Sequence, residues 1–246
     1  MHTVRLPQPG PGIGHALTVQ QELACALRIL AHDGWRENLS GHITWATADG
    51  GMWCNPWGMW WDEVRASDII RLDAEGNVVE GKWDVTGAVF LHTELHRVRP
   101  DARIIIHNHP YYATLLAAMR EVPRIVHQNS CLFDGEIALV DEYGGVGDVE
   151  GGKLLAREVG DASGVILALH GAIVTGASIG EACYKATTFE RMCRLTYDVL
   201  AAGREPEEIP EKQRVDLQEL LLEVTPKAYW DGAVRLLLRD EPEVLD

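Results

Sequence analysis

The sequence has no long apolar run, few basic residues and no paired cysteines. Apolar residues never continue for the roughly 18 positions that a membrane-spanning helix needs, so no membrane association is expected. The 22 Lys and Arg against 37 Asp and Glu give a formal charge of -15. That balance disfavours nucleic acid as a partner, because phosphate groups attract cationic side chains. The start of the chain, rich in proline and glycine, lacks the apolar stretch of a signal peptide.

The five cysteines are an odd number and none forms a CxxC pair, which favours reduced thiols in the cytoplasm over a disulfide framework. The same spacing excludes a zinc ribbon. No GxGxxG follows a strand, and neither a P-loop nor GxSxG occurs, so the common nucleotide-binding and serine-hydrolase motifs are absent. A small-molecule substrate remains the expected partner.

Hydrophobic residues make up 46% of the 246 residues and charged residues 24%, as in ordinary globular proteins. Helical and alternating apolar patterns are interspersed without a repeat or an internal linker, so we expect one α/β domain. Strands are expected in a hairpin over 41–53, near Arg124 and in three apolar segments, and two amphipathic helices are expected to close the chain. The expected organisation is a flexible N-terminal arm (1–17), a domain (18–203) and a C-terminal helical tail (204–246).

Three histidines stand at the ends of apolar segments. His107 and His109 close the run ARIIIHNHP, and residues two apart on a strand share a face, so both imidazoles can point the same way. His170 ends a second apolar run and precedes Gly171, where another backbone can approach closely. Histidine is the commonest metal ligand, and three protein ligands with open positions are typical of a catalytic metal site. Such pairs also occur in protein cores and at exposed strand ends.

His92 and His96 lie four residues apart in HTELH, on one face of an expected helix over 85–98. The segment is not the zincin motif HExxH, because its Glu stands at the third position. The spacing is compatible either with a helix face that packs near the core or with a role for His92 beside the metal.

The order of these segments resembles the class II aldolase/adducin family. The resemblance runs from about Val19 to Leu200 and rests on ENLSGHITWA, NPWGMWWDEVRASDIIRLDAEGNVVEG, HTELHRVRPDARIIIHNHP and ALHGAIVTGASIGEACYKATTFE. The block RPD…HxHP, followed some sixty residues later by HG, is its most specific part.

The resemblance implies a central, mainly antiparallel β-sheet flanked by helices. It also implies a homotetramer with active sites at subunit interfaces, and one divalent metal ion (Zn, Mn or Fe) held by His107, His109 and His170. In the sugar-phosphate aldolases of the family this metal polarises a carbonyl group, which is Lewis-acid catalysis.

Several positions depart from the aldolase pattern. The glutamate that serves as base, four residues before the helical histidine, falls at Ala88; Asp84 and Glu94 are the neighbouring carboxylates that could substitute. The aldolase tyrosine that donates a proton falls near His127, so His92 and His127 are the predicted acid–base residues. The phosphate pocket is replaced by large or differently polar groups, which argues against a phosphorylated substrate. Its positions fall at His42, Trp57, Thr86 and Gly87.

Five of the eight Trp lie within seventeen residues. Trp57, Trp60 and Trp61 stand where the family contacts substrate, and they would suit a planar substrate. The alternative is that they fill the core or a subunit interface. With His42 and Thr86 they complete the predicted substrate-binding set.

Three functions are compatible with this pattern. The first is a metal-dependent carbon–carbon lyase, which decarboxylates or cleaves by retro-aldol reaction a small, non-phosphorylated aromatic or keto acid. The second is a non-haem iron oxygenase acting on a hydroxyphenyl acid, as in an aminocoumarin branch of the family. The third is a non-catalytic scaffold like the adducin heads, although a scaffold has no physical need for the three histidines.

Overall fold

The computed structural model describes residues 7–8, 10–142 and 147–246. In this part of the chain eight strands form one sheet with the order β4-β3-β2-β1-β5-β8-β7-β6. Every neighbouring pair is antiparallel except β6 and β7, so the expected mainly antiparallel sheet is confirmed. The strands are β1 (His42–Ala46), β2 (Met52–Cys54), β3 (Ile70–Leu72), β4 (Val78–Glu80), β5 (Ile104–Asn108), β6 (Ile137–Val140), β7 (Gly164–Leu167) and β8 (Gly171–Gly176).

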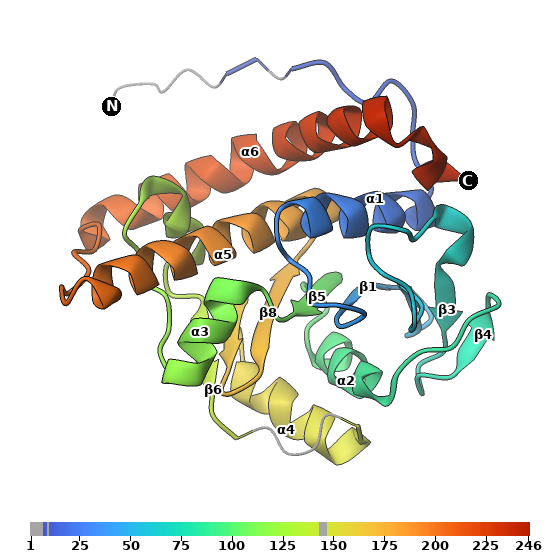
Figure 1. Ribbon diagram of the computed structural model, residues 1–246, viewed down its shortest axis with the longest axis horizontal. Coiled ribbons are helices and arrows are strands. Elements are labelled where there is room, and N and C mark those ends of the chain that lie inside the picture. Colours follow the sequence, from blue (N-terminus) through green and yellow to red (C-terminus); the bar gives the residue numbers. More distant parts are fainter. Residues whose placement is uncertain (1–6, 9, 143–146) are drawn as a thin grey trace.

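Helices cover both faces of the sheet (Figure 1). On one face a large core joins the sheet to α1, α3, α5 and α6, and on the other a smaller core joins it to α2 and α4. The alternation along β5 explains this division, because Ile104 and Ile106 belong to the first core and Ile105 to the second. The helices are α1 (Val19–His32), α2 (Phe90–Val98), α3 (Tyr111–Met119), α4 (Val149–Val159), α5 (Ile179–Ala201) and α6 (Glu211–Asp240).

The helix expected over 18–34 begins where its sequence predicts. Thr18 caps α1 through a hydrogen bond from Gln21 N, and the side chain of Gln21 accepts from Thr18 N in return. This reciprocal capping box satisfies two backbone donors that the helix itself leaves unpaired. The helix ends at His32 and is capped by Asp33, which is followed by Gly34 at a φ of 88°.

The prediction of a strand near Arg124 is wrong. This segment bonds to side chains of other elements instead of joining the sheet: Arg124 N donates to Thr196 Oγ1, and Ile125 N donates to Glu208 Oε1. The carbonyl of Ile125 accepts from Ile209 N. The backbone groups of this segment are therefore satisfied without a neighbouring strand. The apolar pattern is the same in both cases, so it could not distinguish this segment from a strand.

The two helices expected at the end of the chain are one, α6, with Pro226 inside it. Its residues on both sides of the proline pack into the large core, including Leu221 and Trp230. A Cβ at Gly180 of α5 would lie 2.8 Å from Trp230 Cβ and 3.0 Å from Pro226 O, so the glycine permits this close helix contact. Packing against α5 thus favours a continuous helix across the proline. The division into arm, domain and tail stays a prediction.

The described helices contain no segment that is both long and apolar enough to cross a membrane. The five cysteines are buried and free.

Glu190 of α5 caps the N-terminus of α3, where its two carboxylate oxygens accept from Tyr112 N and Ala113 N. Burial raises the pKa of this carboxyl group to about 7, although the two backbone donors act in the opposite direction. Between the unfolded value of 4.5 and about 7 the folded state therefore binds more protons than the unfolded state. This difference makes the contribution of Glu190 to stability fall as pH rises through that range.

We expect Glu190→Gln to remove this pH-dependent term. Urea unfolding from pH 5 to pH 8 should give a stability difference between variant and wild type that moves in favour of the variant as pH rises. Taking the difference cancels the titration of the histidines. Exposed Glu207, changed to Gln, is the control and should give a constant difference. A constant difference for Glu190→Gln as well would contradict the raised pKa.

Candidate metal site

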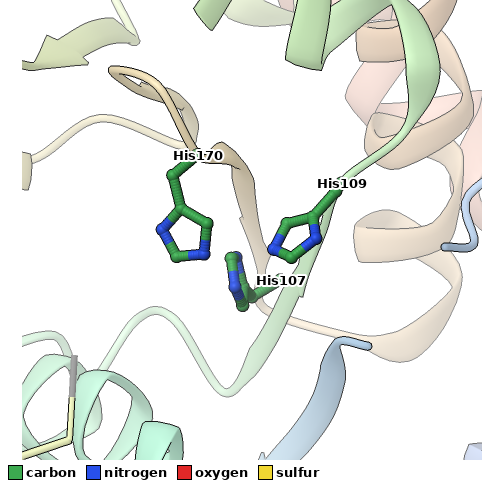
Figure 2. A group of neighbouring side chains, drawn as sticks. All are labelled: His107, His109 and His170. Carbon is green, nitrogen blue, oxygen red and sulfur yellow. The ribbon is translucent and has the colours of Figure 1, made fainter. Parts of the chain in front are cut away.

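The three histidines singled out in the sequence converge near the end of the central strand β5 (Figure 2). His107 lies on β5 and His109 just beyond its end, while His170 lies in the turn between β7 and β8. The β5–β8 register pairs His107 with Ile173 and Asn108 with Ala172, so the β7–β8 turn is held beside the end of β5. Side chains sixty residues apart thereby face a common space.

The spacing of the three rings fits a metal ion. One nitrogen from each lies within 4.8 Å of the others. The ring centroids are 5.3 Å apart for His107 and His109, 4.9 Å for His107 and His170, and 4.8 Å for His109 and His170. Among the described residues this is the one group of histidine, cysteine or acidic side chains with such spacing.

Gly171 allows the two strands to approach at this point. A Cβ there would lie 2.6 Å from both Asn108 O and His109 Cδ2. The preceding turn is strained, because Leu169 has a φ of 59° while its side chain is 68% exposed. Non-glycine residues rarely adopt this conformation, and such strain is concentrated at functional sites.

Hydrogen bonds orient two of the rings for metal binding. His107 Nδ1 donates to Ala172 O at 3.0 Å, which leaves the lone pair of a neutral ring on Nε2. His109 Nδ1 contacts Glu37 Oε2 at 2.5 Å, and His109 Nε2 is buried without a partner. A histidine that pairs with a carboxylate through one nitrogen and offers the other inward is the usual arrangement around a protein-bound metal. The residues present therefore fit a divalent metal ion.

Burial keeps the rings of His107 and His170 neutral. It lowers the pKa of His107 well below its usual value and that of His170 to about 4, and adjacent histidines add to both shifts. A neutral imidazole is the form that binds a metal. The pKa shifts therefore agree with the hydrogen bonds.

Glu37 was missed at the sequence level. It stands 72 residues before His109, inside the quoted segment ENLSGHITWA, and a lone exposed glutamate in a loop carries no recognisable signal. It joins the site because the segment before β1 reaches the end of β5. There Asn108 Nδ2 donates to Trp35 O, two residues before Glu37.

We expect Glu37→Gln to weaken zinc affinity by about 10- to 100-fold, because the carboxylate fixes the orientation and tautomer of His109. Competition with a chelator measures the change. Glu75→Gln, at an exposed carboxylate elsewhere in the chain, is the matched control. Equal zinc affinity for Glu37→Gln and the wild type would exclude this role of Glu37.

A second group of histidines lies beside the first. His92 of α2 and His42 of β1 have ring centroids 5.4 Å apart, and they lie 6.4 and 6.5 Å from His107. His92 is fully buried and His42 is 5% exposed. Thr86 Oγ1 lies 3.1 Å from His42 Nε2. The structure thus brings three residues of the predicted set next to the candidate metal ligands.

The candidate metal group among the described residues contains no carboxylate. Ala88 lies one turn before His92, where it offers only backbone groups, and its N–H donates to Thr86 Oγ1. Glu94 is buried but binds Arg97 through both carboxylate oxygens, at 2.7 and 3.0 Å. Asp84 is exposed, and its backbone carbonyl accepts from Trp57 N.

The tryptophans divide into two kinds. Trp57 and Trp60 are 57% and 45% exposed, whereas Trp61 is 1% exposed and belongs to the large core. This burial favours the core interpretation for Trp61. For the two exposed rings the choice between substrate and interface stays open.

His127 lies at the start of a short 3-10 helix (Gln128–Phe133). Both of its ring nitrogens are buried without a partner, and burial, with a smaller effect of Arg191, lowers its pKa. Neither cause involves the candidate metal ligands, so its acid–base role stays a prediction.

Comparison with known proteins identifies the family. The model of the class II aldolase and adducin N-terminal domain matches residues 21–197. The protein named decarboxylase NovR, from Streptomyces niveus, is 31% identical, covering 76% of this chain and 71% of its own. A protein from Streptomyces roseochromogenus subsp. oscitans named 4-hydroxy-3-prenylphenylpyruvate oxygenase/4-hydroxy-3-prenylbenzoate synthase is also 31% identical, covering 73% and 67%.

An adducin-related protein of Schizosaccharomyces pombe is 32% identical over 66% of this chain, which spans only 53% of that relative. Among solved structures, L-fuculose 1-phosphate aldolase from Glaciozyma antarctica PI12 superposes with a TM-score of 0.81 and 25% identity, covering 93% of this chain and 92% of that chain. The match to the family model and the shared fold lead to one conclusion. The chain belongs to the class II aldolase and adducin family.

Proposed function

We propose that the protein is a metal-dependent carbon–carbon lyase that decarboxylates, or cleaves by retro-aldol reaction, a small non-phosphorylated aromatic or keto acid. The observation that carries the proposal is the triangle of His107, His109 and His170, with the buried Nε2 of His109 unpaired and Glu37 behind it. A scaffold would gain nothing from an unpaired polar atom in this position, since burial without a hydrogen bond is costly.

These three histidines would hold one divalent ion, Zn, Mn or Fe. When bound, the metal supplies Lewis-acid chemistry by polarising an oxygen of the substrate. The protein's own task is to align the rings, which the Ala172 carbonyl does for His107 and Glu37 does for His109.

Ala88 in place of the aldolase base supports decarboxylation in particular, because that reaction requires no base to remove a proton from carbon. Proton transfer would then fall to histidines, and His92 is the residue next to the site. We propose His127 as a second acid–base group.

The proposed substrate contacts are His42, Thr86, Trp57 and Trp60, whereas the predicted contact Trp61 lies in the core. His42 supports this role by its position beside His92, and Thr86 by its contact with His42. Trp57 and Trp60 expose large apolar rings that suit a planar substrate. A phosphorylated sugar fits poorly, since Trp57 offers less hydrogen-bonding capacity than the small hydroxyl residue of the aldolases.

Assembly as a homotetramer, with active sites at subunit interfaces, is part of the proposal. It is supported by Tyr111 and Leu169, two apolar side chains that are each 68% exposed and flank the histidines in sequence. Burying such groups against a second copy would remove them from water. Light scattering of the purified protein measures the assembly state.

A non-haem iron oxygenase is the second candidate, favoured by the relative that is named as an oxygenase. Three neutral histidines with open positions can hold Fe(II), although the commoner iron site includes a carboxylate. Purification without oxygen, elemental analysis and oxygen-uptake assays on hydroxyphenyl acids separate the candidates. Turnover without oxygen supports the lyase. Strict oxygen dependence supports the oxygenase, and a protein that rejects zinc, manganese and iron supports an adducin-like scaffold.

A further inference from the structure

A chain of hydrogen-bonding groups runs behind His92. His96 Nδ1 lies 3.0 Å from Ala102 O, and His96 Nε2 lies 2.8 Å from Thr44 Oγ1. Thr44 Oγ1 in turn lies 2.8 Å from His92 Nδ1. Thr44 and His92 are fully buried, so water does not compete for these contacts.

The positions of the four groups follow from the fold. His92 and His96 are four residues apart on α2, so their side chains lie on the same helix face. Thr44 lies on β1 opposite Ile105 of β5, on the part of the sheet that α2 covers. One hydroxyl group can therefore reach both rings.

Each of these rings carries a single proton near neutral pH. Burial lowers the pKa of His96 to about 4, against a smaller opposing effect of the Ala102 carbonyl. His92 Nε2 is buried without a partner, so a second proton on that ring would be an unpaired buried donor. A neutral imidazole has one N–H donor and one acceptor nitrogen.

The Ala102 carbonyl at one end of this chain of groups then determines the direction of each hydrogen bond. The Ala102 carbonyl can only accept, so His96 Nδ1 carries the proton and His96 Nε2 accepts. Thr44 must donate its only hydroxyl proton to His96 Nε2, since two lone pairs would otherwise face each other at 2.8 Å. Thr44 Oγ1 is left as an acceptor towards His92 Nδ1, which must carry the proton of that ring. The remaining lone pair of His92 is on Nε2.

We propose that Thr44 and His96 are positioning residues that hold His92 in the Nδ1–H tautomer, with Nε2 presented as a proton acceptor to the space beside His107. His92 Nε2 is buried without a partner, and its ring centroid lies 6.4 Å from that of His107. A proton of the substrate or of water moves to Nε2 and leaves its bonding pair behind. Thr44 continues to accept from Nδ1–H and stabilises the imidazolium. The catalytic use of this lone pair rests on the proposed lyase function, whereas the tautomer does not.

The tautomer can be measured directly by NMR. Protein labelled with ¹⁵N-histidine and loaded with one zinc per chain gives two-bond ¹H–¹⁵N correlations, which distinguish protonated from unprotonated ring nitrogens. The His92 signals are assigned by their loss in His92→Gln. The expected result is a protonated Nδ1 and an unprotonated Nε2. A His92 ring protonated at Nε2 alone would overturn the proposal without any variant of the network.

Variants of Thr44 test the cause. Thr44→Val removes the hydroxyl and should abolish the exclusive Nδ1–H pattern, whereas Thr44→Ser should restore it. Thr93→Val is the control, since its hydroxyl is also on α2 but bonds to Phe90 O. An unchanged His92 pattern in folded Thr44→Val would show that the network does not set the tautomer. Zinc content measured on the same samples tests the metal site separately, so failure of one inference is distinguishable from failure of the other.

Discussion

Replacing His109 by alanine is expected to lower zinc affinity by more than about 100-fold and to leave the fold intact. The reason for the first effect is the loss of one of three ligands, which should cost more than the 10- to 100-fold typical of an outer-shell partner. The reason for the second is position, since His109 stands beyond the end of β5 and contributes little to either core. Elemental analysis after dialysis measures the first effect, and circular dichroism of the metal-free protein the second.

The histidine control for this experiment is His15→Ala, which changes an exposed residue near the N-terminus. It should retain one zinc per chain with wild-type affinity. Retention of zinc by His109→Ala would remove His109 from the ligand set. Unfolding of the metal-free variant, with the metal-free wild type folded, would instead assign His109 a structural role.

The candidate site was predictable where its residues lie at the ends of regular elements. His107 and His109 follow from a strand with period two, and His170 follows from a second apolar run that ends at a glycine. The alternation of side chains along β5 agrees with this period, because Ile105 packs in the smaller core with α2. The period therefore placed His107 and His109 on one face, and the family resemblance added His170 to them.

The residues that support the site could not be predicted, because nothing in their local sequence depends on the contact. Glu37 meets His109 across 72 positions, and Thr44 meets His92 across 48. The segment at Arg124 shows the same limit, since its apolar pattern fits a strand while its backbone bonds to Thr196 and Glu208. Side-chain partners of this kind are determined by how the elements pack together, and the periodicity of the sequence gives no information about that packing.

The adjacent rings Trp60 and Trp61 illustrate a related limit. Both stand in one sequence cluster, yet Trp60 is 45% exposed and Trp61 is 1% exposed. The segment after β2 forms no regular element, so no period determines which side chain faces inward. The sequence therefore left open whether these tryptophans contact substrate or fill the core, and it could not show that Trp61 is buried while Trp60 is exposed.

Trp61→Ala is expected to destabilise the protein by about 3–5 kcal/mol, because removing a fully buried aromatic ring loses its transfer free energy and leaves a cavity. Trp61 belongs to the same core as Leu27 and Val64. Urea unfolding of variant and wild type, with zinc held in excess, measures the difference. A loss below about 1 kcal/mol would mean that Trp61 is accessible and would return it to the candidate substrate contacts.

Trp57→Ala completes the comparison, because Trp57 is only four residues from Trp61 and is 57% exposed, whereas Trp61 is 1% exposed. An exposed ring contributes little to folding, so the expected change in stability is within about 0.5 kcal/mol. If Trp57 contacts substrate, the same variant raises KM for the aromatic or keto acid. A large loss of stability would instead assign Trp57 to packing. The pair of variants therefore decides, ring by ring, which tryptophans belong to the fold and which are available to a ligand.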